Sequence, residues 1–147
     1  EHRLALAGLR RINRVSRTAN TIASAIQRIA LRNHLSAFSV LDVGCGSGDV
    51  AMEVQSRLEK RFGCHTTGWD MSSTAIQTAR DRCHTKSKLQ FEVANILEVD
   101  SRLSGAAQFD IVYCSLFLHH FDWKTSISIL QRLRNMSRIA VVVDDLM

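Results

Sequence analysis

Hydrophobic positions recur along the chain with two different spacings, and the change between them falls near residue 36. Up to that point the spacing is that of amphipathic helices, one over residues 3–15 and a second over residues 19–33. Their apolar faces carry Ala5, Leu9, Ile12 and Ser16 in the first helix and Ile22, Ile26, Ile29 and Ala30 in the second. The first 35 residues are therefore expected to form two helices ahead of the main domain.

Beyond residue 36, short runs of β-branched and other apolar residues alternate with stretches of helical spacing. Such alternation is typical of βαβ units, which join parallel strands through right-handed helical crossovers. The strands are almost wholly apolar, as expected for a sheet that helices cover on both faces. Asp122 precedes the last helix and is expected to cap it. We predict a three-layer α/β fold with five strands at 38–43, 66–70, 89–94, 109–115 and 139–143, and helices at 50–61, 74–83 and 123–135.

The composition is that of one globular domain, since 46% of the 147 residues are hydrophobic and 22% are charged. No apolar run approaches the roughly 20 residues that cross a bilayer, and the Arg-rich start lacks the apolar core of a secretory signal. The cysteines form no CxxC pair, which favours reduced thiols over zinc ligands or disulfides. We expect a soluble, cytoplasmic protein without a metal site; its four cysteines are Cys45, Cys64, Cys83 and Cys114.

Positive charge is concentrated at the start of the chain. Seven arginines and one glutamate among the first 35 residues give +6, whereas the remaining 12 basic and 13 acidic residues give −1, for a total of +5. A basic helix attracts nucleic acid, an acidic substrate or anionic lipid, but it is most often only a solvated surface. The charge alone does not decide between these alternatives.

The most informative segment is a glycine-rich loop at residues 44–48, between the first predicted strand and the helix that follows. Glycines let a ligand approach the backbone, and the free amides of a helix start point toward it. In the dinucleotide pattern GxGxxG the third glycine falls at position 49, where this chain has Asp49. A carboxylate there competes with pyrophosphate, and Asp42 adds a second negative charge. A cationic ligand without phosphate is favoured, and S-adenosylmethionine, whose ammonium Asp42 would attract, fits this description.

The second predicted strand ends in Asp70, 26 positions after Gly44. An acid at this place accepts hydrogen bonds from ribose hydroxyls and disfavours a 2′-phosphate. Asp70 therefore predicts an adenosine ligand but is equally compatible with NAD.

Four segments, taken in order, resemble the motif set of class I S-adenosylmethionine-dependent methyltransferases: VLDVGCGSGDVA, GWDMSSTAIQTAR, FEVANILEV and FDIVYCSLFLHHF. The resemblance covers residues 38–147 and implies a Rossmann-like fold. It also implies that the glycine loop surrounds the methionyl part of the cofactor, that Asp70 holds the ribose and that Met71 packs on the adenine. Asn95 stands where the family commonly has Asp, and its amide oxygen still accepts a hydrogen bond. The expected cofactor-binding residues are Asp42, Gly44, Cys45, Gly46, Gly48, Asp70, Met71, Asn95, Ile96, Cys114 and Ser115.

His119 and His120 follow the fourth predicted strand, at the sheet edge where ligands of open α/β folds bind. An imidazole titrates near neutral pH, so either histidine is a candidate base for a hydroxyl acceptor. The alternative is that the pair only shapes the pocket. Asp144 and Asp145 end the fifth strand at the same edge and are open candidates.

The expected function is methylation of a small molecule at O, C or N. The alternatives are an RNA or protein methyltransferase and a non-catalytic or NAD-dependent adenosine-binding domain. Nucleic acid is not an expected partner, because only the basic helices favour it and the Asn/Asp-Pro-Pro-aromatic motif of base N-methylation is absent after the fourth strand. Residues 1–35 are expected to form a lid over the core at 36–147.

The family's sheet has seven strands, and only five are found in this chain. We therefore expect a domain truncated after the fifth strand. The unpaired edge of that strand would favour a homodimer.

Overall fold

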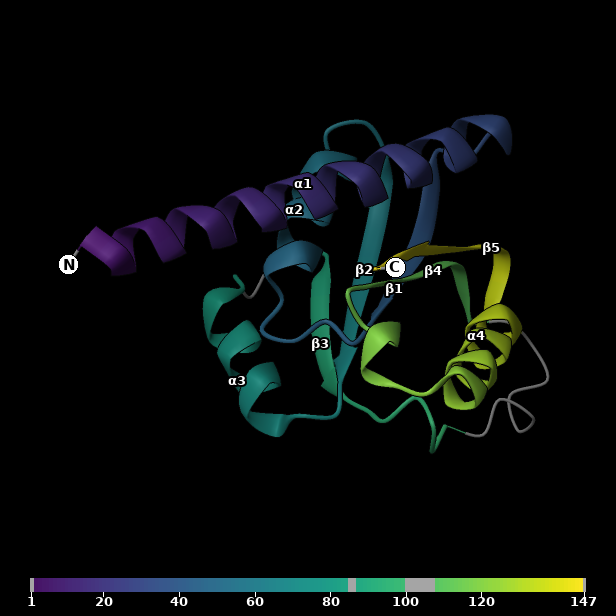
Figure 1. Cartoon of the computed structure of the whole chain (residues 1–147). Coiled ribbons are helices and arrows are strands. Elements are labelled where there is room, and N and C mark those ends of the chain that lie inside the picture. The colour runs from purple at the N-terminus through teal and green to yellow at the C-terminus, as the bar shows by residue number, and fades with distance from the viewer. Residues whose placement is uncertain (1, 85–86, 100–107, 147) are drawn as a thin grey trace.

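The five expected strands form one parallel sheet in the order β3-β2-β1-β4-β5 (Figure 1). The structure, a computed structural model, describes residues 2–84, 87–99 and 108–146. The strands are β1 (Ala37–Val43), β2 (Gly63–Asp70), β3 (Leu89–Val93), β4 (Phe109–Ser115) and β5 (Ser137–Asp144). The helices are α1 (His2–Arg32), α2 (Asp49–Leu58), α3 (Ser73–Arg82) and α4 (Trp123–Met136), with a short 3₁₀ turn η1 (Leu118–His120) after β4. The predicted α/β fold is confirmed.

Helices cover both faces of the sheet because successive strand residues point to opposite sides. On one face, Phe38 and Val40 of β1 pack with the second half of α1 and with α2. On the other face, Leu41 and Val43 pack with α4. In a smaller cluster, residues of α2 and α3 pack together over β3. The carboxyl ends of all five strands consequently meet at one edge, where the chain loops back to the next helix.

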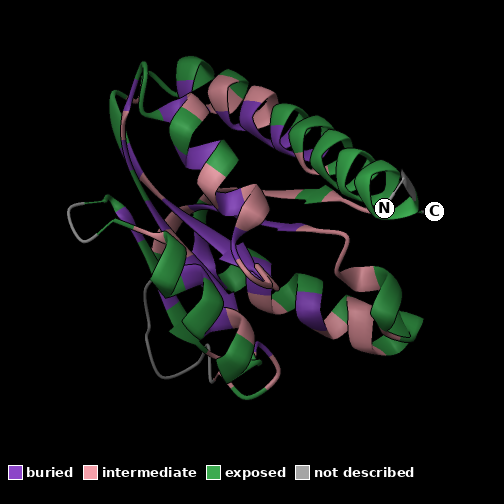
Figure 2. Ribbon diagram, turned by 90° about the vertical axis from the view of Figure 1, so that its left-hand side faces the viewer, coloured by how far each residue is buried: buried purple, intermediate pink, exposed green. Residues whose placement is uncertain are grey.

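The N-terminal segment is one continuous helix of 31 residues, where two helices were expected. The segment between the two predicted helices, Ser16-Arg17-Thr18, contains neither glycine nor proline, so nothing in it interrupts the backbone hydrogen bonds. The apolar positions of residues 3–15 and 19–33 lie on different faces of this one helix, and the reason is packing rather than a break. Only the second half of α1 lies on the sheet, with Ile22 and Ile26 fully buried, whereas Leu4 and Ile12 of the first half are 79% and 65% exposed (Figure 2).

The outer edge of β5 is open among the described residues, since its pairing there is with β4 alone. Val143 near its end is 42% exposed. The homodimer expected from this edge stays a prediction. In the described part of the chain, every helix is too short or too polar to span a membrane.

Candidate active site

The loop between β1 and α2 bends through three glycines with left-handed backbone, at φ values of +76° for Gly44, +56° for Gly46 and +84° for Gly48. The N–H groups of Gly44 and Cys45 donate to the carbonyl of Trp69 at the end of β2, at 2.8 and 2.9 Å. A Cβ on Gly44 would overlap the ring of Phe117, whereas a Cβ on Gly46 would meet no atom within 4 Å. Gly44 is thus required by packing, whereas Gly46 borders open space.

Asp70 lies directly beside this loop, at the end of β2. One of its carboxylate oxygens accepts from the N–H of Gly46 at 2.9 Å, and the other accepts from the N–H of Ser72 at the same distance. A carboxylate offers about four acceptor positions, and these two bonds leave the others free. The neighbouring Met71 is 69% exposed. The end of β2 therefore presents an incompletely used carboxylate beside a solvent-exposed methionine.

Asp42 lies beneath the loop and is only 1% exposed. No described group makes a hydrogen bond of ordinary geometry with either carboxylate oxygen, and the Tyr113 hydroxyl on the paired strand makes none either. Burial raises the pKa of Asp42 to about 7; the nearby Tyr113 hydroxyl acts in the opposite direction and offsets burial only in part, and the negative charge of Asp70 raises the pKa further. An unpaired buried carboxylate is costly, and a cationic group held above it would offset that cost.

Asp49 has a role that the sequence did not reveal. Its carboxylate pairs with Arg11 of α1 at 2.8 Å and with Arg82 of α3 at 2.6 Å. Partial burial alone would raise the pKa of Asp49, but hydrogen bonds and positive charge from the two arginines hold it below its ordinary value. Asp49 therefore connects three helices, and its charge is largely neutralised by its partners.

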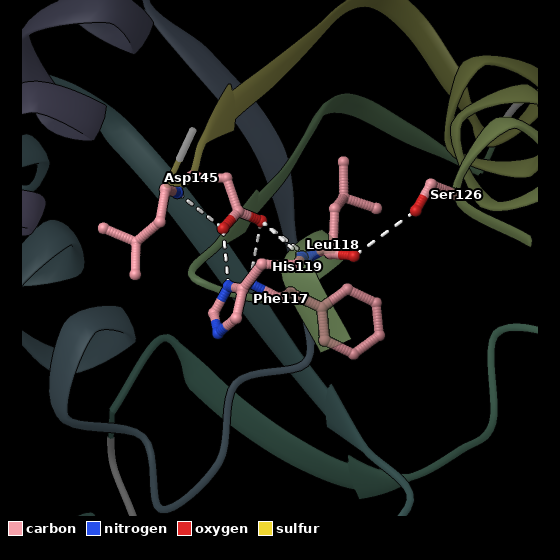
Figure 3. Close-up of polar contacts among 6 residues, drawn as sticks. Phe117, Leu118, His119, Ser126 and Asp145 are labelled. Atoms are coloured by element: carbon pink, nitrogen blue, oxygen red, sulfur yellow. Dashed lines mark hydrogen bonds and ion pairs between the residues drawn. The ribbon is translucent and has the colours of Figure 1, made fainter. Parts of the chain in front are cut away.

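Asp145, just past β5, is surrounded by donors (Figure 3). One oxygen accepts from the backbone N–H groups of Phe117, Leu118 and His119 at 3.1, 2.6 and 3.3 Å. The other lies 2.6 Å from Nδ1 of His119 and accepts from the N–H of Leu146 at 2.7 Å. Partial burial would raise the pKa of Asp145, but these hydrogen bonds, led by that of His119, lower it. The carboxylate fixes both the η1 turn and the His119 ring.

The backbone before η1 turns at Leu116, a non-glycine residue with φ of +49°. Its N–H donates to the carbonyl of Asp144 at 2.8 Å. This turn directs the following N–H groups toward Asp145. The His120 ring lies against that of His119, with 4.1 Å between centroids. Of the two histidines, His119 is the one that a carboxylate orients.

The remaining predicted residues lie around the same edge but contribute differently. The Asn95 side-chain oxygen accepts from the N–H of Leu97 at 3.0 Å, while Ile96 and Cys114 are 4% and 0% exposed within the core under α4. Burial, with the charge of Asp42, raises the pKa of the Cys114 thiol to about 12, which disfavours its thiolate form. Ser115, which ends β4, is partly buried. The part of each in binding a ligand stays a prediction.

A pocket of about 990 Å³ separates the first half of α1 from the ends of β4 and β5. Asp145 forms part of its wall, so the pocket adjoins the hydrogen-bonded pair of Asp145 and His119. Its lining residues are Arg3, Leu6, Ala7, Arg10, Arg11, Asn13, Arg14, Arg17 and Thr18 on α1, and Leu116, Asp144, Asp145 and Leu146 opposite.

Residues 40–139 match the family model of a methyltransferase domain, and the chain belongs to this family. This confirms the resemblance seen in the four motifs, and with it the Rossmann-like fold. The chain is 33% identical over 89 residues to ubiquinone biosynthesis O-methyltransferase of Erwinia tasmaniensis, an alignment that covers 60% of this chain and 34% of that protein. It is 27% identical over 93 residues to phosphoethanolamine N-methyltransferase of Plasmodium falciparum, covering 63% and 32%.

A solved structure of the plantazolicin methyltransferase BpumL in complex with SAH is similar in fold, with a TM-score of 0.66 and 25% sequence identity. The similarity covers 88% of this chain and 46% of that one. The chain thus spans about a third of the length of the two curated relatives.

Proposed function

We propose that this domain binds S-adenosylmethionine at the carboxyl ends of β1 and β2 and transfers its methyl group to a small molecule. The observation that carries the proposal is the Asp42 carboxylate, buried without a partner beneath a glycine loop that borders open space. A sulfonium cofactor with a free ammonium supplies the positive charge that this carboxylate lacks. NAD has no such group beside its pyrophosphate, so the unpaired carboxylate favours S-adenosylmethionine over NAD.

Each part of the site then has a separate task in holding the cofactor. The backbone of the Gly44–Gly48 loop, with Cys45, faces the methionyl part, and Cys114 and Ser115 lie at the adjoining strand end. Asp70 uses its free acceptor positions for the ribose hydroxyls. Met71, Asn95 and Ile96 border the adenine.

Methyl transfer from a sulfonium is an in-line displacement with a good leaving group, so the protein contributes mainly by aligning the acceptor and excluding water. The first half of α1 extends past the sheet edge and serves as a lid. Asp145 accepts a hydrogen bond from Nδ1–H of His119 in the neutral tautomer, which leaves Nε2 to accept a proton from the acceptor. The same carboxylate stabilises the imidazolium that results.

The names of the two curated relatives refer to small molecules, since one is an O-methyltransferase of ubiquinone biosynthesis and the other is a phosphoethanolamine N-methyltransferase. This favours a small acceptor over RNA or protein. We place the reaction in the cytoplasm, since all four cysteines are free thiols. The open edge of β5 is the proposed contact of a homodimer.

Calorimetry with S-adenosylmethionine, SAH and NAD tests the cofactor assignment. We expect both sulfur compounds to bind and Asp70→Ala to weaken them by about tenfold or more, because two charge-assisted hydrogen bonds are lost. Asp81→Ala, which removes an exposed carboxylate from α3, is the matched control and is expected to change nothing. Binding of NAD in place of S-adenosylmethionine, or full affinity in Asp70→Ala, would overturn the assignment.

A further inference from the structure

The wall that α1 contributes to the pocket is a stripe of arginines. Arg3, Arg10, Arg14 and Arg17 are separated by seven, four and three residues, which places them on one face of the helix. The three from Arg10 to Arg17 occupy successive turns, so their guanidinium groups are neighbours. All four are exposed and line the pocket.

These four arginines are not matched by acids of the described chain. The fifth arginine of the wall, Arg11, is paired with Asp49 outside the stripe, whereas Arg3, Arg10, Arg14 and Arg17 form no ion pair with a described residue. Across the pocket, Asp145 is already committed to His119 and to four backbone N–H groups. Asp144 is the other acid in the lining, so positive charge is in excess.

The pocket also has apolar walls. Leu6 and Ala7 of α1 lie among the arginines, and Leu116 and Leu146 line the opposite side. A ligand with an anionic group and an apolar body matches both features. The guanidinium groups suit carboxylates and phosphates, which they bind with two parallel hydrogen bonds.

We propose that the methyl acceptor carries a carboxylate or a phosphate group, held by Arg10, Arg14 and Arg17, with its apolar part between α1 and the end of β5. This proposal rests on the proposed function and adds the chemical class of the acceptor. An anion held on α1 would leave the rest of the acceptor facing the opposite wall. Asp145 is part of that wall and is hydrogen-bonded to His119.

A small anion fits this surface better than RNA does. No aromatic side chain lines the pocket among the described residues, whereas single-stranded RNA is bound largely by stacking bases on aromatic rings. The net charge of residues 36–147 is −1, so the basic surface does not extend over the rest of the domain.

The test compares each anion with a neutral molecule that has the same aromatic body. The full protein, saturated with SAH, is titrated by calorimetry with 4-hydroxybenzoate and 4-hydroxybenzamide, and with phenyl phosphate and phenol. The first pair tests the carboxylate and the second tests the phosphate. We expect the anion of at least one pair to bind about 10-fold more tightly than its neutral counterpart, as for one charge-assisted contact in an open site.

The arginines are then removed in the same assay. Arg10→Gln/Arg14→Gln should reduce the preference for the anion to about threefold or less, and Arg17→Gln alone should reduce it partially. Arg28→Gln, an exposed arginine of α1 outside the pocket, is the matched control and should keep the full preference. All four arginines are exposed, so the variants are expected to unfold at the wild-type temperature.

Three results would overturn the proposal. One is equal binding, or no binding, of anion and neutral molecule in both pairs. Another is an anion preference that survives Arg10→Gln/Arg14→Gln. The third is a single-stranded oligouridylate that displaces the anionic probe with a steep dependence on salt, which would make the stripe an RNA surface. The titrations are repeated without SAH, so a failure to bind SAH counts against the proposed function alone.

Discussion

Two aspartates at the same sheet edge are treated in opposite ways by the fold. Asp42, at the end of β1, is buried with both oxygens unpartnered, and burial raises its pKa to about 7. Asp145, after β5, accepts hydrogen bonds from four backbone N–H groups and is paired with Nδ1 of His119. These contacts lower its pKa despite partial burial. One half of the edge leaves its charge uncompensated, whereas the other half compensates its charge within the protein.

The two carboxylates therefore have different roles. A carboxylate whose hydrogen bonds are complete holds neighbouring groups in place, and Asp145 does this for η1 and His119. A buried carboxylate without partners destabilises the fold until a cation arrives, so part of the ligand's binding energy is relief of that cost. We infer that the β1–β2 half is completed by the cofactor and that the β4–β5 half is organised before any ligand binds.

The largest effect is expected from removing the side chain that Asp145 orients. His119→Gln should lower kcat by about 10²- to 10⁴-fold for a hydroxyl acceptor, because a general base contributes a factor of this size. The affinity for SAH should not change, since the imidazole lies in the β4–β5 half of the edge, away from the glycine loop. Methyl transfer and calorimetry on the same preparation measure the two quantities.

His65→Gln is the matched control, because this exposed histidine lies in β2, five residues before its carboxyl end. It should leave kcat unchanged. A larger loss of kcat in His120→Gln than in His119→Gln would contradict the assignment of the base to the histidine that Asp145 holds.

The next largest effect is expected from Asp42, whose charge has no partner in the protein. Asp42→Asn keeps the shape of the side chain but removes its charge, and we expect S-adenosylmethionine to bind about 10- to 100-fold more weakly. In the wild type, affinity should increase as the pH rises through about 7, where Asp42 becomes ionised. The variant should lack this dependence. A variant that retains the pH dependence would show that another group causes it.

The same substitution should have the opposite effect on stability. Because the folded pKa of Asp42 is above its ordinary value of 3.8, the folded state retains the proton longer than the unfolded chain does. The stability of the ligand-free protein should therefore fall as the pH rises from about 4 to 7, by at most roughly 4 kcal/mol for a shift of this size. Asp42→Asn should be the more stable protein at pH 8, as measured by denaturant unfolding. A less stable variant would contradict the unpaired state of the carboxylate.

Much of this arrangement was predictable, because it follows from local patterns. Alternating apolar runs predicted all five strands and the helices between them, and Asp122 caps α4 as expected, accepting from the N–H of Thr125 at 2.7 Å. The glycine loop and Asp70 were selected as candidate site residues from their positions at the ends of the first two predicted strands. What the sequence could not give were contacts between distant segments, such as Arg11 with Asp49 and Asp145 with the η1 amides. The single helix α1 was missed because its two halves present different faces, and that difference reflects packing rather than a break.

The smallest effect tests why position 46 is glycine. Gly46, in the β1–β2 half of the edge, and Leu116, in the β4–β5 half, share a left-handed backbone, at φ of +56° and +49°. The fold therefore tolerates a side chain in this conformation, at a cost of roughly 1 kcal/mol. A Cβ on Gly46 would meet no protein atom within 4 Å, so Gly46→Ala should lower stability only by about that amount. The affinity for SAH distinguishes the two possible reasons for the glycine. If backbone conformation were the only reason, SAH affinity would be unchanged in Gly46→Ala.

If the open space is where the methionyl part lies, SAH affinity should fall by about 3- to 10-fold, because the added methyl group occupies that space. Gly8→Ala, at an exposed position of α1 where a Cβ also meets nothing, is the control and should leave affinity as it is. Calorimetry and thermal unfolding of the three proteins decide between a glycine kept for its backbone and a glycine kept for a ligand.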